Sequence, residues 1–152
     1  MMTINLVCVG NLKEKFWKDA AEEYKKRLSK FCKLNIIEVQ EQNKYDDIEK
    51  IKQIEGEDIC TKLEGKSYLL DIGGNQYASE EFATELKLAA LVNSTLTFVI
   101  GGSYGVSGKV KSSVRSRISF GKATYPHNLA RIILLEQIYR AFMINSGAKY
   151  HK

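Results

Sequence analysis

The sequence contains very little proline, cysteine and histidine. Its 152 residues include one proline, three cysteines and two histidines, His127 and His151. The cysteines form no CxxC pair and both histidines lie far from them, so we expect neither a disulfide framework nor a metal site. The chain is 44% hydrophobic and 27% charged, which is typical of a packed globular protein and excludes a disordered or fibrous one.

Long hydrophobic runs are also missing. The apolar stretch at the N-terminus ends at Gly10 and is followed by charged residues, so it is too short for a signal sequence or a membrane span. We therefore expect a cytoplasmic protein with reduced thiols and no membrane partner. The length suits one domain over residues 1–152.

Acidic residues are nearly absent from the last third of the chain. Residues 96–152 contain nine basic residues against one acid, Glu136, and therefore have a net charge of +8. Residues 1–95 have a net charge of −3. We therefore expect a polyanionic partner such as RNA to contact the C-terminal third.

Short β-branched runs alternate with longer segments of helical periodicity, which indicates an α/β fold with a mainly parallel sheet and helices on both faces. We predict strands at residues 3–9, 34–39, 67–72, 95–100 and 118–120. We predict helices at residues 14–32, 48–63, 109–117 and 127–144, and a further helix that begins at Ser79.

The last predicted helix, which contains ARIILLEQIYRAFMI, is apolar on nearly every side. A helix of this kind must be buried all round, and in a small chain a second copy can cover it. We therefore predict a homodimer. Arg131 and Arg140 interrupt the apolar surface, and Glu136 is expected to pair with one of them.

Three glycine-containing loops follow predicted strands, at residues 70–74, 101–109 and 120–126. Ligands of open α/β sheets bind beyond the carboxyl ends of the strands, so we expect these loops to share a pocket. The second loop, GGSYGVSGK, fails the Walker A pattern because Ser103 stands where the first glycine is required and Val110 follows Lys109. Taken alone, this loop is equally typical of a tight turn.

The two histidines each allow two interpretations. His127 follows the only proline and is either a first-turn helix residue or a catalytic group. His151 lies in a terminal segment, GAKYHK, of a kind that commonly frays. The mixture of aromatic and basic residues in this tail also suits stacking on RNA.

The whole chain resembles the 23S ribosomal RNA pseudouridine N3-methyltransferase family of the SPOUT (α/β-knot) superfamily. Three segments carry the resemblance: VGNLKEKFWKDAAEEYKKRL, FVIGGSYG and FGKATYPHNLARIILLEQIYRAFMINSGAKYHK. The resemblance implies a homodimeric enzyme with a C-terminal trefoil knot and S-adenosyl-L-methionine as cofactor. It also implies the substrate, N3 of a pseudouridine in helix 69 of the large-subunit ribosomal RNA, methylated on the assembled ribosome without a metal.

The family's cofactor residues carry over by position to the three loops. They correspond to Leu70, Gly101, Gly102, Phe120, Gly121, Lys122, Ala123, Thr124 and Tyr125.

Methyl transfer to an imide nitrogen requires alignment and loss of a proton. We therefore assign Arg140 to stabilise the deprotonated base and His151 or His127 to accept its proton. The residues expected to contact RNA are Lys109, Lys111, Arg115, Arg117, Arg131, Tyr150 and Lys152. We expect a second subunit to complete the site.

The alternative is a non-catalytic, dimeric RNA-binding or ribosome-associated protein, which would use the basic third without a cofactor. Binding of S-adenosyl-L-methionine discriminates between the two hypotheses. A nucleotide hydrolase is disfavoured by the failed Walker A match.

Overall fold

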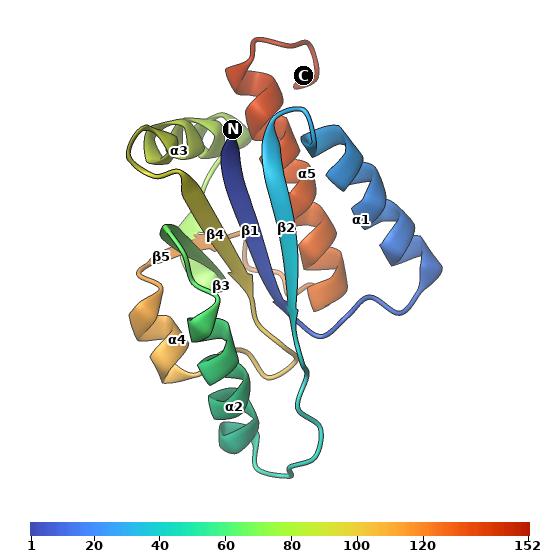
Figure 1. Cartoon of the computed structure of the whole chain (residues 1–152), viewed down its shortest axis with the longest axis vertical. Helices are drawn as coiled ribbons and strands as arrows, with labels where there is room; N and C mark the ends of the chain where they lie inside the picture. The colour runs from blue at the N-terminus through green and yellow to red at the C-terminus, as the bar shows by residue number, and fades with distance from the viewer.

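The computed structural model describes residues 1–152 and contains five strands and five helices. The strands are β1 (Met2–Val9), β2 (Cys32–Val39), β3 (Lys66–Gln76), β4 (Thr95–Ile100) and β5 (Ser116–Ser119). The helices are α1 (Lys15–Leu28), α2 (Ile48–Thr61), α3 (Ser79–Val92), α4 (Gly108–Ser113) and α5 (His127–Asn145). All neighbouring strands are parallel, in the order β2-β1-β4-β3-β5 (Figure 1).

Alternating side chains of the central strands supply two apolar cores, one on each face of the sheet. On one face, Leu6 of β1 and Phe98 of β4 pack with α1, α3 and α5. On the other face, Val7 and Val99 belong to a cluster with α2 and α4. This arrangement confirms the predicted α/β fold with a parallel sheet and helices on both faces. The trefoil knot stays a prediction.

Three helices end earlier than predicted, and for two of them the next strand begins sooner. α2 ends at Thr61, two residues before its predicted end. α1 ends at Leu28, since Cys32 is already the first residue of β2. α4 ends at Ser113, since Ser116 pairs with Tyr68 of β3. A strand of four residues that includes an arginine has too little apolar alternation to be recognised within a basic segment.

The spacing of Ile48, Ile51, Ile54, Ile59 and Leu63 predicts that these residues form the buried side of α2. Ile51 is buried as predicted, but Ile48 is 46% exposed. Glu55 and Gly56 take buried positions instead. A Cβ on Gly56 would overlap the hydroxyl of Ser107, so the glycine lets α2 approach the loop after β4 closely.

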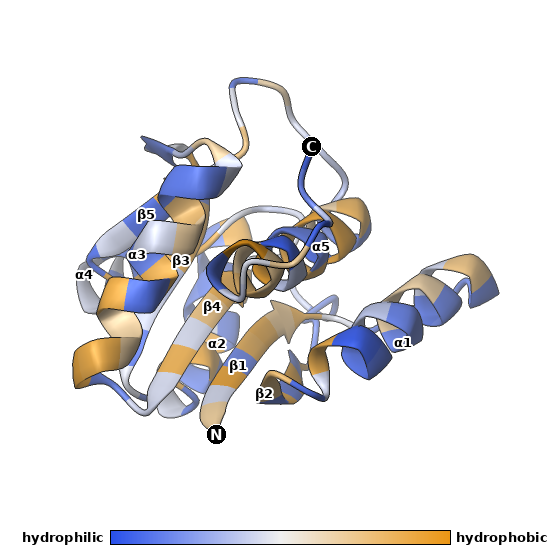
Figure 2. Cartoon of the chain, turned by 90° about the horizontal axis from the view of Figure 1, so that it is seen from above, coloured by the Kyte–Doolittle hydropathy of each residue, from blue (hydrophilic) through white to orange (hydrophobic).

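One side of α5 stays open within a single copy of the chain. Leu134, Leu135 and Ile138 are fully buried against the sheet, whereas Ile133 and Ile144 are half-buried. Figure 2 shows apolar residues over much of α5, while hydrophilic and hydrophobic residues alternate along α1. Neither α5 nor any other helix is long and apolar enough to cross a membrane.

Candidate cofactor and RNA site

Two of the three predicted loops follow β4 and β5, whereas residues 70–74 lie within β3, which continues to Gln76, and the three segments line neighbouring cavities. A cavity of about 300 Å³ is lined by Leu70, Gly101, Gly102, Tyr125 and His127, together with their neighbours. A second cavity, of about 260 Å³, shares Leu70 and Tyr125 with the first. The loop after β5 lines the rest of it with Phe120, Gly121, Ala123 and Thr124. Lys122 is exposed and lines neither cavity, so it is the one predicted cofactor residue that the structure leaves apart.

The loop after β4 depends on glycine for two different reasons. Gly105 has a φ of +84°, in the left-handed region that side chains disfavour. A Cβ on Gly101 would lie 2.6 Å from Val106 Cγ1. The Gly105 N–H also donates to the Gly102 carbonyl (3.0 Å), which closes the loop on itself. The backbone of this tight loop therefore forms the cavity wall.

The walls of these cavities suit an adenosyl group. Backbone N–H and C=O groups of the loops can pair with the edge of an adenine, and Leu70, Ile100 and Ala130 offer apolar contact to its faces. Small-molecule sites commonly occupy roughly 300–1,000 Å³, a range that the two adjoining cavities reach together. The residues present therefore fit S-adenosyl-L-methionine, the cofactor that the resemblance implies.

Asp71 connects the cofactor cavities to the edge of the sheet, although the sequence analysis assigned it no role. Its Oδ2 accepts a hydrogen bond from Arg117 Nη1 (3.3 Å), and its Oδ1 accepts one from the Gly73 N–H (3.1 Å). Asp71 also lines both cavities. The signal that could have identified it is an acidic residue that interrupts an apolar strand shortly before two glycines.

A polar cleft of about 490 Å³ lies where β3, α4 and β5 meet. Lys111, Arg115 and Arg117, three of the residues predicted to contact RNA, line it together with residues 73–75. Lys111 also lines the larger cofactor cavity, so the cleft adjoins that cavity. The arrangement can hold RNA phosphates beside the cofactor. Lys109 does not line this cleft and is paired with Glu57 (2.8 Å).

Arg131 is not available to RNA, and the prediction that it contacts RNA is wrong in this respect. Its side chain is only 3% exposed. The guanidinium donates hydrogen bonds to Glu38 Oε2 (2.9 Å) and to the Gly10 carbonyl (3.1 Å). Arg131 therefore ties α5 to the ends of β1 and β2, so the partner that a buried arginine requires lies within the chain.

Arg140 and the C-terminal tail form a polar cluster at the far end of α5. Arg140 Nε donates to Glu136 Oε1 (2.7 Å), so Arg140 is the arginine that pairs with this acid. The guanidinium lies over the ring of Tyr150 (4.8 Å) and 3.1 Å from His151 Nδ1. His151 Nε2 is 2.5 Å from Glu80 Oε1 at the start of α3. The tail thus packs against both helices, and its last residue, Lys152, is exposed.

Both ring nitrogens of His151 are occupied in this cluster. Because the guanidinium of Arg140 can only donate, Nδ1 must accept, and Nε2 then carries the hydrogen that it donates to Glu80. His151 therefore has no free lone pair for a substrate proton. A hydrogen bond from its own backbone N–H, and then the one from His151, hold the pKa of the Glu80 carboxyl below its usual range. No pattern in the sequence indicates this role of Glu80.

The three predicted catalytic residues fall into two groups along α5. His127 begins the helix beside Gly101 and Gly102. At the helical rise of 1.5 Å per residue, Arg140 lies about 20 Å further along the axis, and His151 lies with it. A single copy therefore separates the cofactor loops from the Arg140 cluster.

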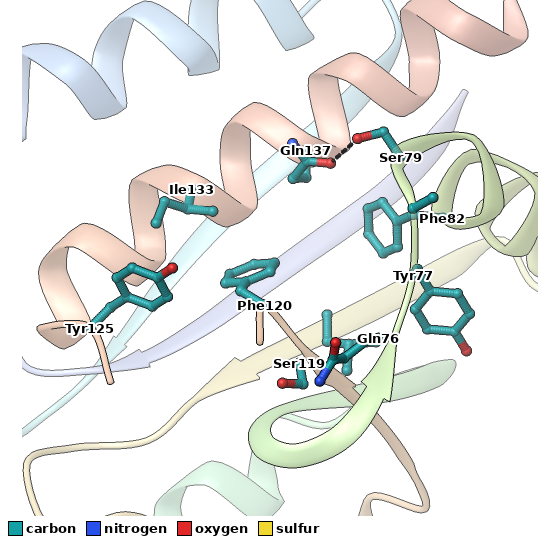
Figure 3. A pocket seen from close by; sticks show the side chains of 11 residues that line it. Gln76, Tyr77, Ser79, Phe82, Ser119, Phe120, Tyr125, Ile133 and Gln137 are labelled. Atoms are coloured by element: carbon teal, nitrogen blue, oxygen red, sulfur yellow. Dashed lines mark hydrogen bonds between the residues drawn. The ribbon is translucent and has the colours of Figure 1, made fainter. Parts of the chain in front are cut away.

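A third pocket, of about 380 Å³, opens between the start of α3 and the open side of α5 (Figure 3). Tyr77, Phe82 and Phe120 contribute aromatic rings to its walls. At its polar end, Ser79 Oγ donates a hydrogen bond to Gln137 Oε1 (2.9 Å). Phe120 also lines the smaller cofactor cavity, so the two spaces are neighbours.

Comparison with known proteins agrees with this geometry. Residues 2–151 match the model of a family described as "Predicted SPOUT methyltransferase". "Ribosomal RNA large subunit methyltransferase H" of Lactobacillus helveticus is 52% identical over 159 aligned residues, which cover 99% of this chain and 100% of the relative. The proteins of the same name from Lactobacillus acidophilus and Pediococcus pentosaceus are 51% and 47% identical, with the same coverage. The resemblance is thereby confirmed, and the chain belongs to the SPOUT methyltransferase family.

Proposed function

We propose that this protein uses S-adenosyl-L-methionine to methylate large-subunit ribosomal RNA in the cytoplasm. We further propose that its target is N3 of a pseudouridine in helix 69, on the assembled ribosome. The observation that carries the proposal is that three glycine-containing segments line adjoining cavities beside a basic cleft, in a chain that matches its relatives over their full length. A cofactor cavity next to phosphate-binding cations is the arrangement that RNA methylation requires.

S-adenosyl-L-methionine, when bound, supplies a methyl group on a positively charged sulfur that is already activated for transfer. Leu70, Gly101, Phe120, Gly121 and residues 123–125 would hold the adenosyl group through backbone hydrogen bonds and apolar contacts. The protein's remaining tasks are to align the target nitrogen and to favour loss of its proton.

We assign the proton acceptor to His127. Its imidazole lines the larger cofactor cavity and makes no hydrogen bond to another side chain, whereas both nitrogens of His151 are occupied. Arg140 would stabilise the negative charge of the deprotonated base. His151 and Glu80 would then keep the guanidinium of Arg140 in position.

The site requires two copies of the chain, since His127 and Arg140 lie at opposite ends of α5. The open side of this helix carries Ile133 and Ile144, next to the aromatic pocket of Figure 3. An antiparallel, two-fold pairing of α5 covers these residues and places the Arg140 cluster of one copy beside the cofactor loops of the other. We therefore propose a homodimer with composite sites.

The decisive experiment is mass spectrometry of ribosomal RNA from cells that lack the gene. We expect loss of one methyl group from a pseudouridine, and its return when purified protein and cofactor are added to the isolated ribosomes. Unchanged ribosomal RNA in the deletion strain would contradict the proposal.

A non-catalytic RNA-binding role is the alternative, and the basic cleft alone would support it. Calorimetry separates the two functions. Heat of binding on addition of S-adenosyl-L-methionine favours the methyltransferase, and its absence at millimolar cofactor favours the binding protein.

A further inference from the structure

A buried carboxylate lies behind the cofactor loop without a cation beside it. Glu55 of α2 is only 5% exposed. Its Oε2 accepts a hydrogen bond from the Gln42 N–H (2.9 Å), and no hydrogen bond reaches its Oε1. Burial raises the pKa of the Glu55 carboxyl, and the charge of Glu41 adds to this rise. No positively charged group therefore bonds to the Glu55 carboxylate, and the nearby charge of Glu41 is also negative.

Glu55 forms no salt bridge, and two lysines, Lys52 and Lys111, line the larger cofactor cavity. Lys52, one turn earlier on α2, pairs with Glu49 (3.3 Å). Arg131 pairs with Glu38. A buried carboxylate without a cation is costly, and the cost is recovered when a ligand supplies the missing charge.

Gly102 lies beside Glu55 and also lines the larger cofactor cavity. A Cβ on Gly102 would lie 3.2 Å from Glu55 Oε1 and 3.0 Å from Val9 Cγ1. The close contact of Gly56 with Ser107 holds α2 against this loop, so the carboxylate stays in place. Its field therefore enters the cavity through a position that has no side chain, in surroundings of low dielectric constant.

We propose that Glu55 selects the positive charge of the cofactor, with Gly102 as the opening through which it acts. The proposal rests on S-adenosyl-L-methionine being the cofactor. That molecule carries a sulfonium and an ammonium group, and the demethylated product keeps only the ammonium. Glu55 would therefore favour the methyl donor over the spent product without touching either.

Calorimetry with three ligands of decreasing positive charge tests this proposal on the full-length protein. The ligands are S-adenosyl-L-methionine, S-adenosyl-L-homocysteine and 5′-methylthioadenosine, which carry two, one and no positive charges. For Glu55→Gln we expect about a tenfold loss of affinity for the first, a smaller loss for the second and no loss for the third. Glu57→Gln, which removes an exposed acid two residues further along α2, is the matched control and should change none of them.

Glu41→Gln provides a second variant at an exposed position, and we expect the same order of losses with smaller values. The variant Gly102→Ala should weaken all three ligands, because its Cβ closes the opening and crowds the loop. Equal losses for all three ligands in Glu55→Gln would overturn the proposal, since the carboxylate would then only support the loop. If the unmodified protein binds none of the ligands, the proposed methyltransferase function fails, and the role of Glu55 fails with it.

Discussion

Arg131 illustrates at the residue scale why a polar residue on an apolar helix has several possible roles. An arginine is costly to bury, so its position on an apolar helix requires a partner. The partners, Glu38 and the Gly10 carbonyl, lie about a hundred residues away in the sequence. Only the fold brings these groups together. Arg131 was therefore predicted to contact RNA, whereas in the structure it stabilises the fold.

Removing the Arg131 side chain should therefore destabilise the fold and leave the basic cleft intact. For Arg131→Met we expect a loss of about 2–3 kcal/mol in the free energy of unfolding, since Glu38 and Gly10 lose their donor and Glu38 stays half-exposed. Urea denaturation measures this loss. If the Arg131→Met variant is as stable as the wild type but binds RNA more weakly and with less dependence on salt, Arg131 contacts RNA and the structural role is wrong.

Glu85 gives a pH-dependent prediction. The hydroxyl of Tyr68 donates to Glu85 Oε1 (2.8 Å), and this bond, opposed by burial and assisted by Lys66, holds the pKa of the carboxyl below its usual range. A lowered pKa in the folded state stabilises the protein above the usual carboxyl pKa of about 4.3. That contribution is lost as the pH falls through the lower, folded-state value.

We therefore expect Tyr68→Phe to cost about 1 kcal/mol of unfolding free energy at pH 7, and progressively less as the pH falls through the lowered folded-state pKa and Glu85 becomes protonated. The ring stacking on Phe98 is retained in this variant. Thermal unfolding at several pH values measures the difference. Tyr77→Phe, at a half-buried tyrosine whose hydroxyl makes no hydrogen bond in the protein, is the control. If the loss of unfolding free energy in Tyr68→Phe stays the same at low pH, the hydrogen bond to the Glu85 carboxylate is not its cause.

At the scale of elements, the sequence predicted strands and helices wherever apolar periodicity was strong. β4 and the start of α5 were predicted at their observed positions. The errors lie where tertiary contacts override the pattern. β3 continues past its glycines to Gln76 because a bulge lets Asn75 pair again with Ile118 of β5.

The glycine loop after β4 allows a prediction about cofactor binding. An alanine at Gly101 brings its Cβ within 2.6 Å of Val106 Cγ1, so the loop must shift. For Gly101→Ala we expect at least about a tenfold loss of affinity for S-adenosyl-L-methionine, measured by calorimetry. Gly108→Ala is the control, because a Cβ on Gly108 at the start of α4 meets no atom within 4 Å. If the two variants bind S-adenosyl-L-methionine with the same affinity, the loop after β4 does not belong to the cofactor site.

At the scale of the whole molecule, the composite site predicts complementation between two inactive variants. Arg140→Ala lacks the cation of the tail cluster, and Gly101→Ala lacks the cofactor loop. Mixed dimers would contain one intact site. After exchange of subunits we expect about a quarter of the wild-type methylation rate, because half of the dimers are mixed and each has one working site.

The control for this experiment is a mixture of Arg140→Ala with Glu136→Gln, which alters the same cluster and should not restore activity. Light scattering should give the mass of two chains throughout. A monomeric mass, or no recovery in the first mixture, would mean that each chain works alone.

The division of charge along the chain predicts how RNA binding depends on salt. Alanine at Lys111 or at Arg115 should each lower the slope of log K against log salt concentration by about 0.7–1, because each removes one phosphate contact in the cleft. Lys109→Ala should change it less, since Lys109 is already paired with Glu57. Titration of ribosomal RNA fragments at several salt concentrations provides the measurement, and equal slopes for all variants would exclude the cleft.

The sequence by itself determined the α/β class, most element positions, the three loops and the basic C-terminal third. These features depend on local periodicity, glycine content and charge, all of which can be read from residues that are close together in the sequence. The tertiary structure alone decided that Arg131 is structural and that His127 and Arg140 lie far apart. It also placed Glu80 beside His151 and Glu55 behind the cofactor loop. Such pairings depend on contacts between segments distant in the chain, for which a single sequence has no periodic signal.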